Sequence, residues 1–299
     1  MHKRALLWML ILALFLPSAA LAEAEAQKRV YRVDEEDAVP FAEDAQTLEL
    51  YVCSLLGADS MILTVQGRTV LVDMGAVTSF ETIDGLLQEL GVERIDIAFN
   101  SHPHNDHLGA MEQLAGKYPV GVFMTAFPEN YTGSAVIQKP AIKALRAAGI
   151  PVVTVSDGDT LVLGDARMTV IRQGKYESPN RLSAMLRIEY GDCTLLLTGD
   201  VEDAAQPYLA ELYTLSADIF KYPHHGLSKL DKAFLEAIGA EYTFFTHGSG
   251  DTKEAQKQMD KAGIPYDFAT WGTIHISTNG EYWLVEQWLN EKGLRYSGK

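Results

Sequence analysis

Short apolar runs alternate with amphipathic, helix-like segments along most of the chain. The pattern begins with strand-like runs at 48–54, 60–65 and 69–73, and the turn residues Gln66 and Gly67 predict a β-meander here. Further strands are expected at 95–99, 152–155, 168–171, 183–189, 194–198, 217–221, 242–246, 273–277 and 281–285. Helices are expected at 78–90, 108–117, 140–148, 201–213, 231–238 and 252–262.

This order of elements predicts an α/β fold in which two mixed β-sheets are flanked by helices. No internal segment is rich enough in Pro, Gly or Ser to divide the chain, so residues 47–299 are expected to form one domain. Residues 23–46 are then an N-terminal linker or extension. The 299 residues, 47% of them hydrophobic, are enough to bury a large core.

The first residues have the pattern of an export signal. Lys3 and Arg4 precede an apolar run over residues 5–16, and Ala20-Leu21-Ala22 follows as a small-residue cleavage site. A spanning helix needs roughly 20 apolar residues, so this run favours a signal peptide, residues 1–22, over a permanent anchor. We therefore expect cleavage after Ala22, no membrane span in the mature chain, and a secreted, periplasmic or cell-envelope protein.

Charge limits the range of partners. The chain carries 25 Lys and Arg against 40 Asp and Glu, a net charge of −15, and cleavage of the signal would change this to −17 (23 minus 40). So acidic a surface repels polyphosphate, which disfavours long nucleic acids as partners. A small substrate with a single phosphate group remains compatible with a local positive site.

Cysteine is scarce. Cys53 and Cys193 both lie in apolar, strand-like runs. Export permits a disulfide, but a small buried thiol is the commoner state of such a residue, and the sequence leaves the pairing open. The absence of any C-x-x-C pair excludes a zinc finger.

The strongest chemical signal follows the predicted strand 95–99. Three of the eight histidines lie within six residues here, in the segment Ser101-His102-Pro103-His104-Asn105-Asp106-His107. In extended chain His102 and His104 project to the same side, and Asp106 and His107 at the following turn can reach a second ion. Imidazole and carboxylate are the zinc ligands of sites that keep a position open for water.

The pattern His102-x-His104-x-Asp106-His107 resembles the signature of the metallo-β-lactamase superfamily, whose αββα sandwich holds metal ions at the sheet edges. Three further segments are similar to motifs of this family. Asp73 resembles the carboxylate that braces the metal loop, Asp200 the aspartate that bridges two ions, and Lys221-Tyr-Pro-His-His-Gly226 the final histidine motif.

The resemblance implies two zinc ions, with manganese or iron as alternatives. His102, His104 and Asp200 would hold the first ion, and Asp106, His107, Asp200 and His225 the second. His224 would contact the substrate phosphate or donate a proton, although exchanged roles for His224 and His225 stay open. Asp106 and Asp73 join His224 as expected catalytic residues, with Asp73 acting through the ligand that it orients.

Within the superfamily, Gly57-Ala-Asp-Ser60, Thr198-Gly-Asp200 and Pro223-His-His-Gly226 are similar to the extracellular metallohydrolase domain of the competence protein ComEC and to exported phosphorylcholine esterases. Both act on phosphodiesters. No histidine occurs between residues 108 and 223, where many members have a third ligand, and Asn180 resembles the asparagine of the ComEC-like pattern. The resemblance then implies a weaker first site and leaves a mononuclear resting state open.

These observations favour an exported phosphodiesterase in which a zinc-bound hydroxide attacks phosphorus. A lactam, lactone or thioester hydrolase of the same fold is the first alternative. A surface binding module that has kept the fold without turnover is the second, and the intact set of ligands argues against it.

Overall fold

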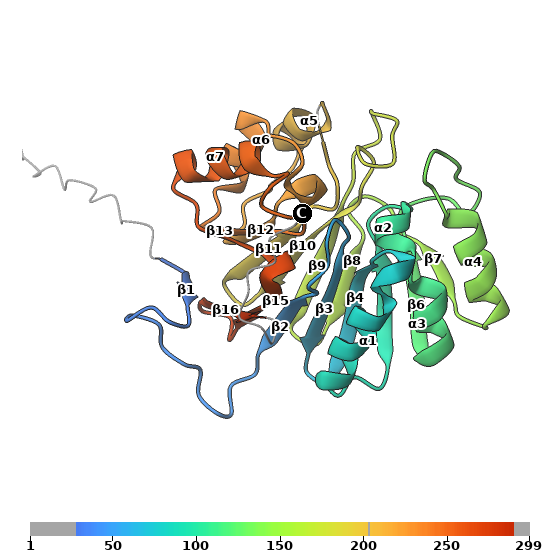
Figure 1. Ribbon diagram of the computed structural model, residues 1–299, viewed down its shortest axis with the longest axis horizontal. Helices are drawn as coiled ribbons and strands as arrows, with labels where there is room; N and C mark the ends of the chain where they lie inside the picture. The colour runs from blue at the N-terminus through green and yellow to red at the C-terminus, as the bar shows by residue number, and fades with distance from the viewer. Residues whose placement is uncertain (1–27, 203, 290–299) are drawn as a thin grey trace, which may run out of the picture.

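The computed structural model describes residues 28–202 and 204–289, which form a sandwich of two β-sheets with helices on both outer sides (Figure 1). The first sheet has the order β1-β16-β15-β2-β3-β4-β5-β6-β7, and the second has the order β14-β13-β12-β11-β10-β9-β8. The predicted αββα sandwich with two mixed sheets is therefore confirmed.

The bounds of the strands fix where the connecting loops lie. In the first sheet they are β1 (Val30–Arg32), β2 (Leu48–Val52), β3 (Ser60–Val65), β4 (Arg68–Met74), β5 (Ile95–Asn100), β6 (Val120–Thr125), β7 (Val152–Thr154), β15 (Gly272–Thr278) and β16 (Trp283–Leu289). In the second they are β8 (Thr160–Leu163), β9 (Ala166–Ile171), β10 (Met185–Tyr190), β11 (Cys193–Leu197), β12 (Ile219–Lys221), β13 (Tyr242–Phe245) and β14 (Tyr266–Phe268).

Helices cover the outer face of each sheet. The first sheet is covered by α1 (Phe80–Glu89), α3 (Met111–Lys117) and α4 (Gln138–Ala147), and a short helix α2 (Asn105–Leu108) follows β5. The second is covered by α5 (Ala205–Leu212), α6 (Lys232–Ile238) and α7 (Lys253–Ala262). Three apolar clusters result, one between the sheets and one beneath each layer of helices.

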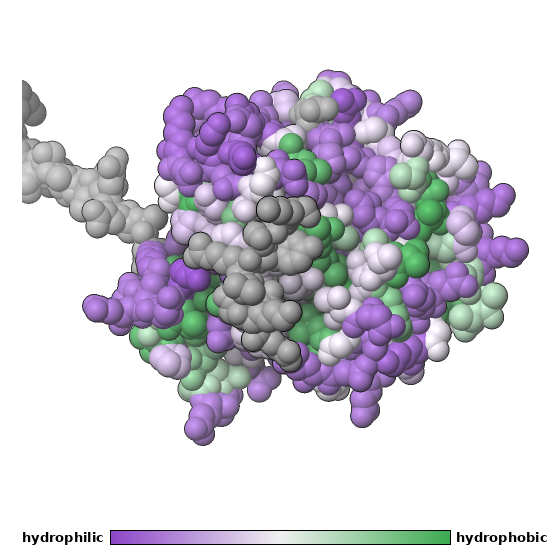
Figure 2. All heavy atoms as spheres, in the orientation of Figure 1, coloured by the Kyte–Doolittle hydropathy of each residue, from purple (hydrophilic) through white to green (hydrophobic). Residues whose placement is uncertain are grey.

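Local sequence explains these elements. Every residue of β4 after Arg68 is buried, because helices cover one face of the strand and the second sheet covers the other. Asp231 caps α6 by accepting from the backbone N–H of Ala233 and Phe234, and Gly239 ends the helix with a φ of 60°. On the face shown in Figure 2, hydrophilic residues predominate, as expected where amphipathic helices turn their polar sides outward.

Four strands were missed by the sequence analysis: β1, β6, β8 and β14. β8 is an edge strand whose apolar run, Leu161-Val162-Leu163, is shorter than the run of about four to eight residues by which strands are recognised. β1 lies in the segment assigned to the N-terminal extension, yet it pairs in parallel with β16 through Val30 and Trp283. Structured chain therefore begins before residue 47.

The two cysteines are free and buried. Cys53 lies between the first sheet and its helices, whereas Cys193 lies in the cluster between the sheets, so the two thiols occupy different layers. The proposed signal peptide, residues 1–22, lies outside the described residues. Within residues 28–202 and 204–289, no helix has the length and hydrophobicity needed to cross a bilayer.

Candidate metal centre

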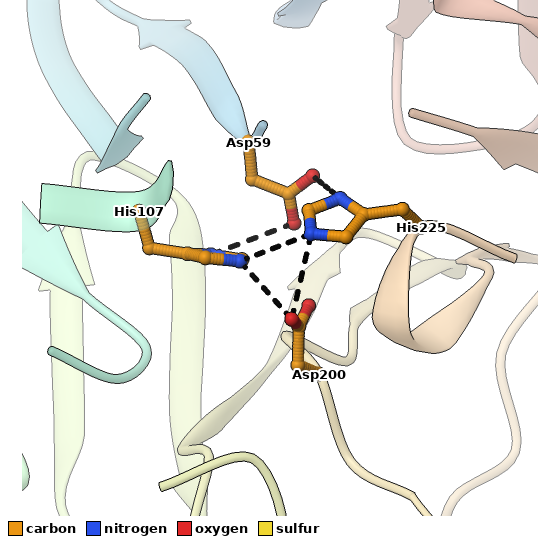
Figure 3. Close-up of side chains that lie close together, drawn as sticks. All are labelled: Asp59, His107, Asp200 and His225. Carbon is orange, nitrogen blue, oxygen red and sulfur yellow. Dashed lines mark hydrogen bonds and ion pairs between the residues drawn. The ribbon is translucent and has the colours of Figure 1, made fainter. Parts of the chain in front are cut away.

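The predicted metal ligands meet at one edge of the sandwich because they follow parallel strands. β4 and β5 are parallel neighbours in the first sheet, and β11 and β12 are parallel neighbours in the second. Asp73 lies at the end of β4, and the histidine cluster follows β5; Asp200 follows β11, and His225 follows β12. The carboxyl ends of such strands are the usual place for a binding site in an α/β sheet. Figure 3 shows His107, Asp200 and His225 pointing toward one another.

Four donor atoms form a compact group. Nε2 of His107 lies 3.3 Å from Nε2 of His225, and Oδ2 of Asp200 lies 3.2 Å and 3.4 Å from these two nitrogens. Oδ2 of Asp106 is 3.4 Å from Nε2 of His225 and 3.9 Å from Nε2 of His107. Ligands about 2.0–2.1 Å from a tetrahedral zinc ion are about 3.3 Å from one another, so this group fits one such ion.

Two buried aspartates hold these imidazoles from behind. Oδ2 of Asp73 lies 2.8 Å from Nδ1 of His107, and Oδ1 of Asp59 lies 3.0 Å from Nδ1 of His225. When the N–H at Nδ1 donates a hydrogen bond to a carboxylate, Nε2 is directed into the site and can bind a metal once it has no proton. Both rings thus have the orientation that a metal requires.

Asp59 was not among the predicted site residues. It belongs with His107, Asp200 and His225 to a buried group whose potential ligand atoms all lie within 4.8 Å of one another. Its Oδ1 faces the Nδ1 side of His225, which is the side away from Nε2, so we assign it an orienting role. The motif Gly57-Ala-Asp-Ser60 was the available signal, but it assigned no contact to the carboxylate.

Asp73 braces both halves of the histidine cluster. Its Oδ1 accepts from the backbone N–H of Ser101 at 2.7 Å and from the Asn100 amide at 3.0 Å. Its Oδ2 accepts from Ser101 Oγ at 2.7 Å, and Ser101 Oγ lies 3.1 Å from Nδ1 of His102. Asp73 therefore holds His107 directly and His102 through Ser101.

The first predicted site has fewer donors. Nε2 of His102 lies 3.1 Å from Nδ1 of His104 and 3.8 Å from Oδ2 of Asp200. Asn180 instead lies beside His224, with its amide nitrogen 3.4 Å from Nε2 of that ring. Its Oδ1 is buried and has no hydrogen-bond partner among the described residues. This arrangement supplies three firm donors and one amide oxygen that an ion or a substrate could engage.

The final histidine motif forms a tight turn, the short 3-10 element η2 (Pro223–Gly226). His224 and His225 both have positive φ, 49° and 56°, an uncommon backbone conformation for residues other than Gly. The turn separates the two rings. His225 is buried among the metal-site residues. His224 instead has its Nδ1 2.9 Å from Oε2 of Glu202 and lies next to Asn180. Of the two, His225 therefore has the geometry of a ligand.

The carboxylates determine the charge of the metal-free site. Burial lowers the pKa of His107, but the carboxylates of Asp200, Asp73 and Asp59 outweigh it and raise the pKa to about 10. Burial raises the pKa of Asp200, but His107 and His225 outweigh it and hold that pKa well below its ordinary value. In the metal-free site the carboxylates are therefore negatively charged and keep the neighbouring imidazoles protonated. A metal ion that binds there would displace protons from these imidazoles.

A family model for the metallo-β-lactamase superfamily matches residues 53–247, about two-thirds of the chain, and the chain therefore belongs to this superfamily. No curated protein sequence matches it significantly.

Solved structures are similar to this chain at low sequence identity. CmlA, a diiron β-hydroxylase from Streptomyces venezuelae, is 14% identical over 76% of this chain and 53% of CmlA, with a TM-score of 0.52. The chain thus spans about half the length of CmlA. The metallo-β-lactamase fold protein YhfI from Bacillus subtilis is 14% identical over 75% of this chain and 96% of YhfI, with a TM-score of 0.49. Igni18, a metallo hydrolase from Ignicoccus hospitalis, is 15% identical over 81% of this chain and 99% of Igni18, with a TM-score of 0.47.

Proposed function

We propose that the chain is an exported, metal-dependent phosphodiesterase that acts on small substrates. The observation that carries the proposal is the pairing of His224 with Asn180, 3.4 Å apart, because Asn180 lies in the part of the sequence, between the histidine cluster and Asp200, where many relatives have a third histidine ligand. An imidazole and an amide offer hydrogen bonds to the oxygens of a phosphoryl group, whose charge increases during displacement. The ComEC-like motifs noted in the sequence support the same substrate class.

The donor set suits two zinc ions, which when bound lower the pKa of coordinated water and neutralise negative charge on a phosphoryl group. His107, His225, Asp106 and Asp200 would hold the second ion, and His102, His104 and Asp200 the first. His224, with Glu202 2.9 Å from its Nδ1, is positioned to donate a proton to the leaving alkoxide through Nε2. Asp73 acts by orienting His107.

Zinc is our choice among the metals because imidazole and carboxylate in a tetrahedral arrangement are typical of it. Manganese and iron are alternatives, since metal availability can outrank intrinsic preference, and CmlA is a diiron enzyme. With three firm donors in the first site, we propose that this site is filled less tightly than the second.

The proposal is tested with Asp200→Ala and His104→Ala. Both variants should lose hydrolysis of bis-p-nitrophenyl phosphate while keeping the circular dichroism spectrum of the wild type. His275→Ala is the matched control, because His275 lies on β15, where it pairs with Glu49, and should retain activity. Undiminished turnover in Asp200→Ala or His104→Ala would refute the assignment.

Two competing functions are addressed in parallel. Nitrocefin hydrolysis without phosphodiester hydrolysis would favour a lactam hydrolase of the same fold. Purified protein without bound metal by elemental analysis, and without turnover on any substrate, would favour a binding module. A panel of phosphorylcholine esters, cyclic dinucleotides and single-stranded DNA would define the substrate, and we expect small esters to exceed DNA because the net charge is −15.

We also propose that the protein is exported, because residues 1–22 have the pattern of a signal peptide. Expression of the full chain with mass analysis of the mature protein tests it. An N-terminus at Glu23 is expected, and a mature protein that begins at Met1 would contradict export by cleavage.

A further inference from the structure

A lysine is fully buried directly behind the metal centre. Lys221 ends β12 with a side-chain exposure of 0%, and its Nζ lies 2.6 Å from Oδ2 of Asp59. The ammonium group also donates to the carbonyl oxygen of Gly199 at 2.9 Å. Burial lowers the pKa of Lys221, but the carboxylates of Asp59 and Asp200 outweigh it and raise the pKa above its ordinary value. The side chain is therefore a buried cation.

Buried ion pairs are costly to form, and replacing one with apolar residues of similar volume is often neutral or stabilising. A contribution to stability is therefore a weak explanation for the presence of this ion pair. Its position suggests a role at the metal site, because each partner contacts a different metal-site residue.

Asp59 connects the pair to His225. While Oδ2 of Asp59 faces Lys221, its Oδ1 lies 3.0 Å from Nδ1 of His225. On the opposite side of the same ring, Nε2 lies 3.4 Å from Oδ2 of Asp200. Asp59, together with Thr246 Oγ1 at 2.9 Å from the same Nδ1, thus holds the imidazole so that Nε2 faces the other donors.

Lys221 connects the pair to Asp200. Oδ1 of Asp200 lies 3.6 Å from Nζ of Lys221. Oδ2 of the same carboxylate faces three imidazoles, at 3.2 Å from His107, 3.4 Å from His225 and 3.8 Å from His102. The cation lies on the Oδ1 side and so leaves a single oxygen directed at both predicted metal sites.

We propose that Lys221 and Asp59 form a positioning pair for the metal centre, in which Asp59 orients His225 and Lys221 selects the oxygen of Asp200 that faces the ions. The proposal rests on the metal-binding part of the proposed function and is independent of which bond is cleaved. Neither residue contacts substrate in this role.

The double variant Asp59→Leu/Lys221→Met separates positioning from charge. It removes one anion and one cation together, so the net charge of the site is conserved and neither member of the pair is left buried without the other. The matched control is Arg32→Met/Asp267→Leu, which removes an ion pair that joins β1 to β14.

The measurements use the full chain as purified. Competition with a chromophoric chelator gives the Kd for Zn²⁺, and the visible absorption of the Co²⁺-substituted protein reports the coordination geometry. Outer-shell substitutions typically weaken metal binding by about 10–100-fold, and we expect a loss in this range for the double variant, with a changed Co²⁺ spectrum. The control should lower Tm while leaving the Kd and the spectrum unchanged.

The single variant Lys221→Met distinguishes positioning from simple repulsion. Removing a positive charge near Asp200 should tighten Zn²⁺ binding if Lys221 acts only through its charge, whereas loss of positioning weakens binding. A Kd within twofold of wild type in the double variant would overturn the inference, as would tighter binding by Lys221→Met. A wild-type chain that binds no metal would overturn the proposed function as well, so the two failures are distinguishable.

Discussion

Replacing Asp73 with Asn tests the orientation of the metal ligands with almost no change of shape. Oδ1 of Asp73 accepts from the backbone N–H of Ser101 and the side-chain amide of Asn100, so the oxygen of the new amide must stay there. The new NH₂ group then faces Nδ1 of His107, which in the wild type lies 2.8 Å from the carboxylate oxygen. Because two donors cannot pair, the proton of the ring is displaced to Nε2 and points into the metal site.

The magnitude follows from the contacts that are lost. Substitution of an outer-shell carboxylate costs about 10–100-fold in metal affinity, equivalent to about 1.4–2.7 kcal/mol. We expect the upper end of this range for Asp73→Asn, because Asp73 also supports His102 through Ser101. The metal-free fold should lose about 1.5–3 kcal/mol, the usual contribution of a hydrogen bond to a charged group.

The assay is the Kd for Zn²⁺ at constant pH, with urea unfolding in excess chelator to measure the free energy of unfolding separately. Asp84→Asn is the control, since Asp84 is a buried aspartate that pairs with Lys117 and Tyr118 between α1 and α3. It should lower stability without lowering metal affinity. An Asp73→Asn protein that binds Zn²⁺ as tightly as wild type would refute the orientation argument.

Four further predictions concern proton release, the pH dependence of stability, metal stoichiometry and the final turn. Because the pKa of His107 is raised to about 10 and that of His225 well above its ordinary value, both rings are charged at pH 7 without metal. Metal binding should therefore release protons, and calorimetry in buffers of different ionisation enthalpy should count them. The raised pKa of His107 should also stabilise the metal-free fold fully below about pH 6.5, with loss of this contribution as the pH rises toward 10, measurable by urea unfolding. Asn180→His should supply the absent third imidazole and raise the zinc content measured by mass spectrometry; an unchanged content would place residue 180 outside the first site. Gly226→Ala should lower Tm by several degrees, since its φ is 94° and an added Cβ would lie 2.3 Å from a ring carbon of Phe245; an unchanged Tm would contradict this.

The fold was predictable where burial leaves a pattern in the sequence. The helix 231–238 was predicted within one residue of α6, because a capping aspartate and a terminal glycine mark its ends. The edge strand β8 was not found in this way, since its apolar run is only three residues long. β1 was missed because its pairing with β16 joins distant parts of the chain.

Residues of the candidate metal centre were likewise predictable only where the sequence carries a local pattern. His102, His104, Asp106 and His107 could be predicted as ligands because they are close in sequence and follow one strand. Asp59 was visible only as part of the motif Gly57-Ala-Asp-Ser60, and its role was missed because its partner His225 is 166 residues away along the chain. Lys221 was read only as part of a motif, because burial of a lysine is visible in the folded chain alone.

The donors proposed for the second site come from both sheets, so metal binding there would be coupled to the packing of the two sheets against each other. His107 belongs to the first sheet through the loop after β5, whereas Asp200 and His225 belong to the second through the loops after β11 and β12. An ion bound by all three residues would therefore link the two sheets. Free metal at about 100 times its Kd would stabilise the folded state by about 2.7 kcal/mol, so the metal-free chain is expected to be cleaved by proteases more readily.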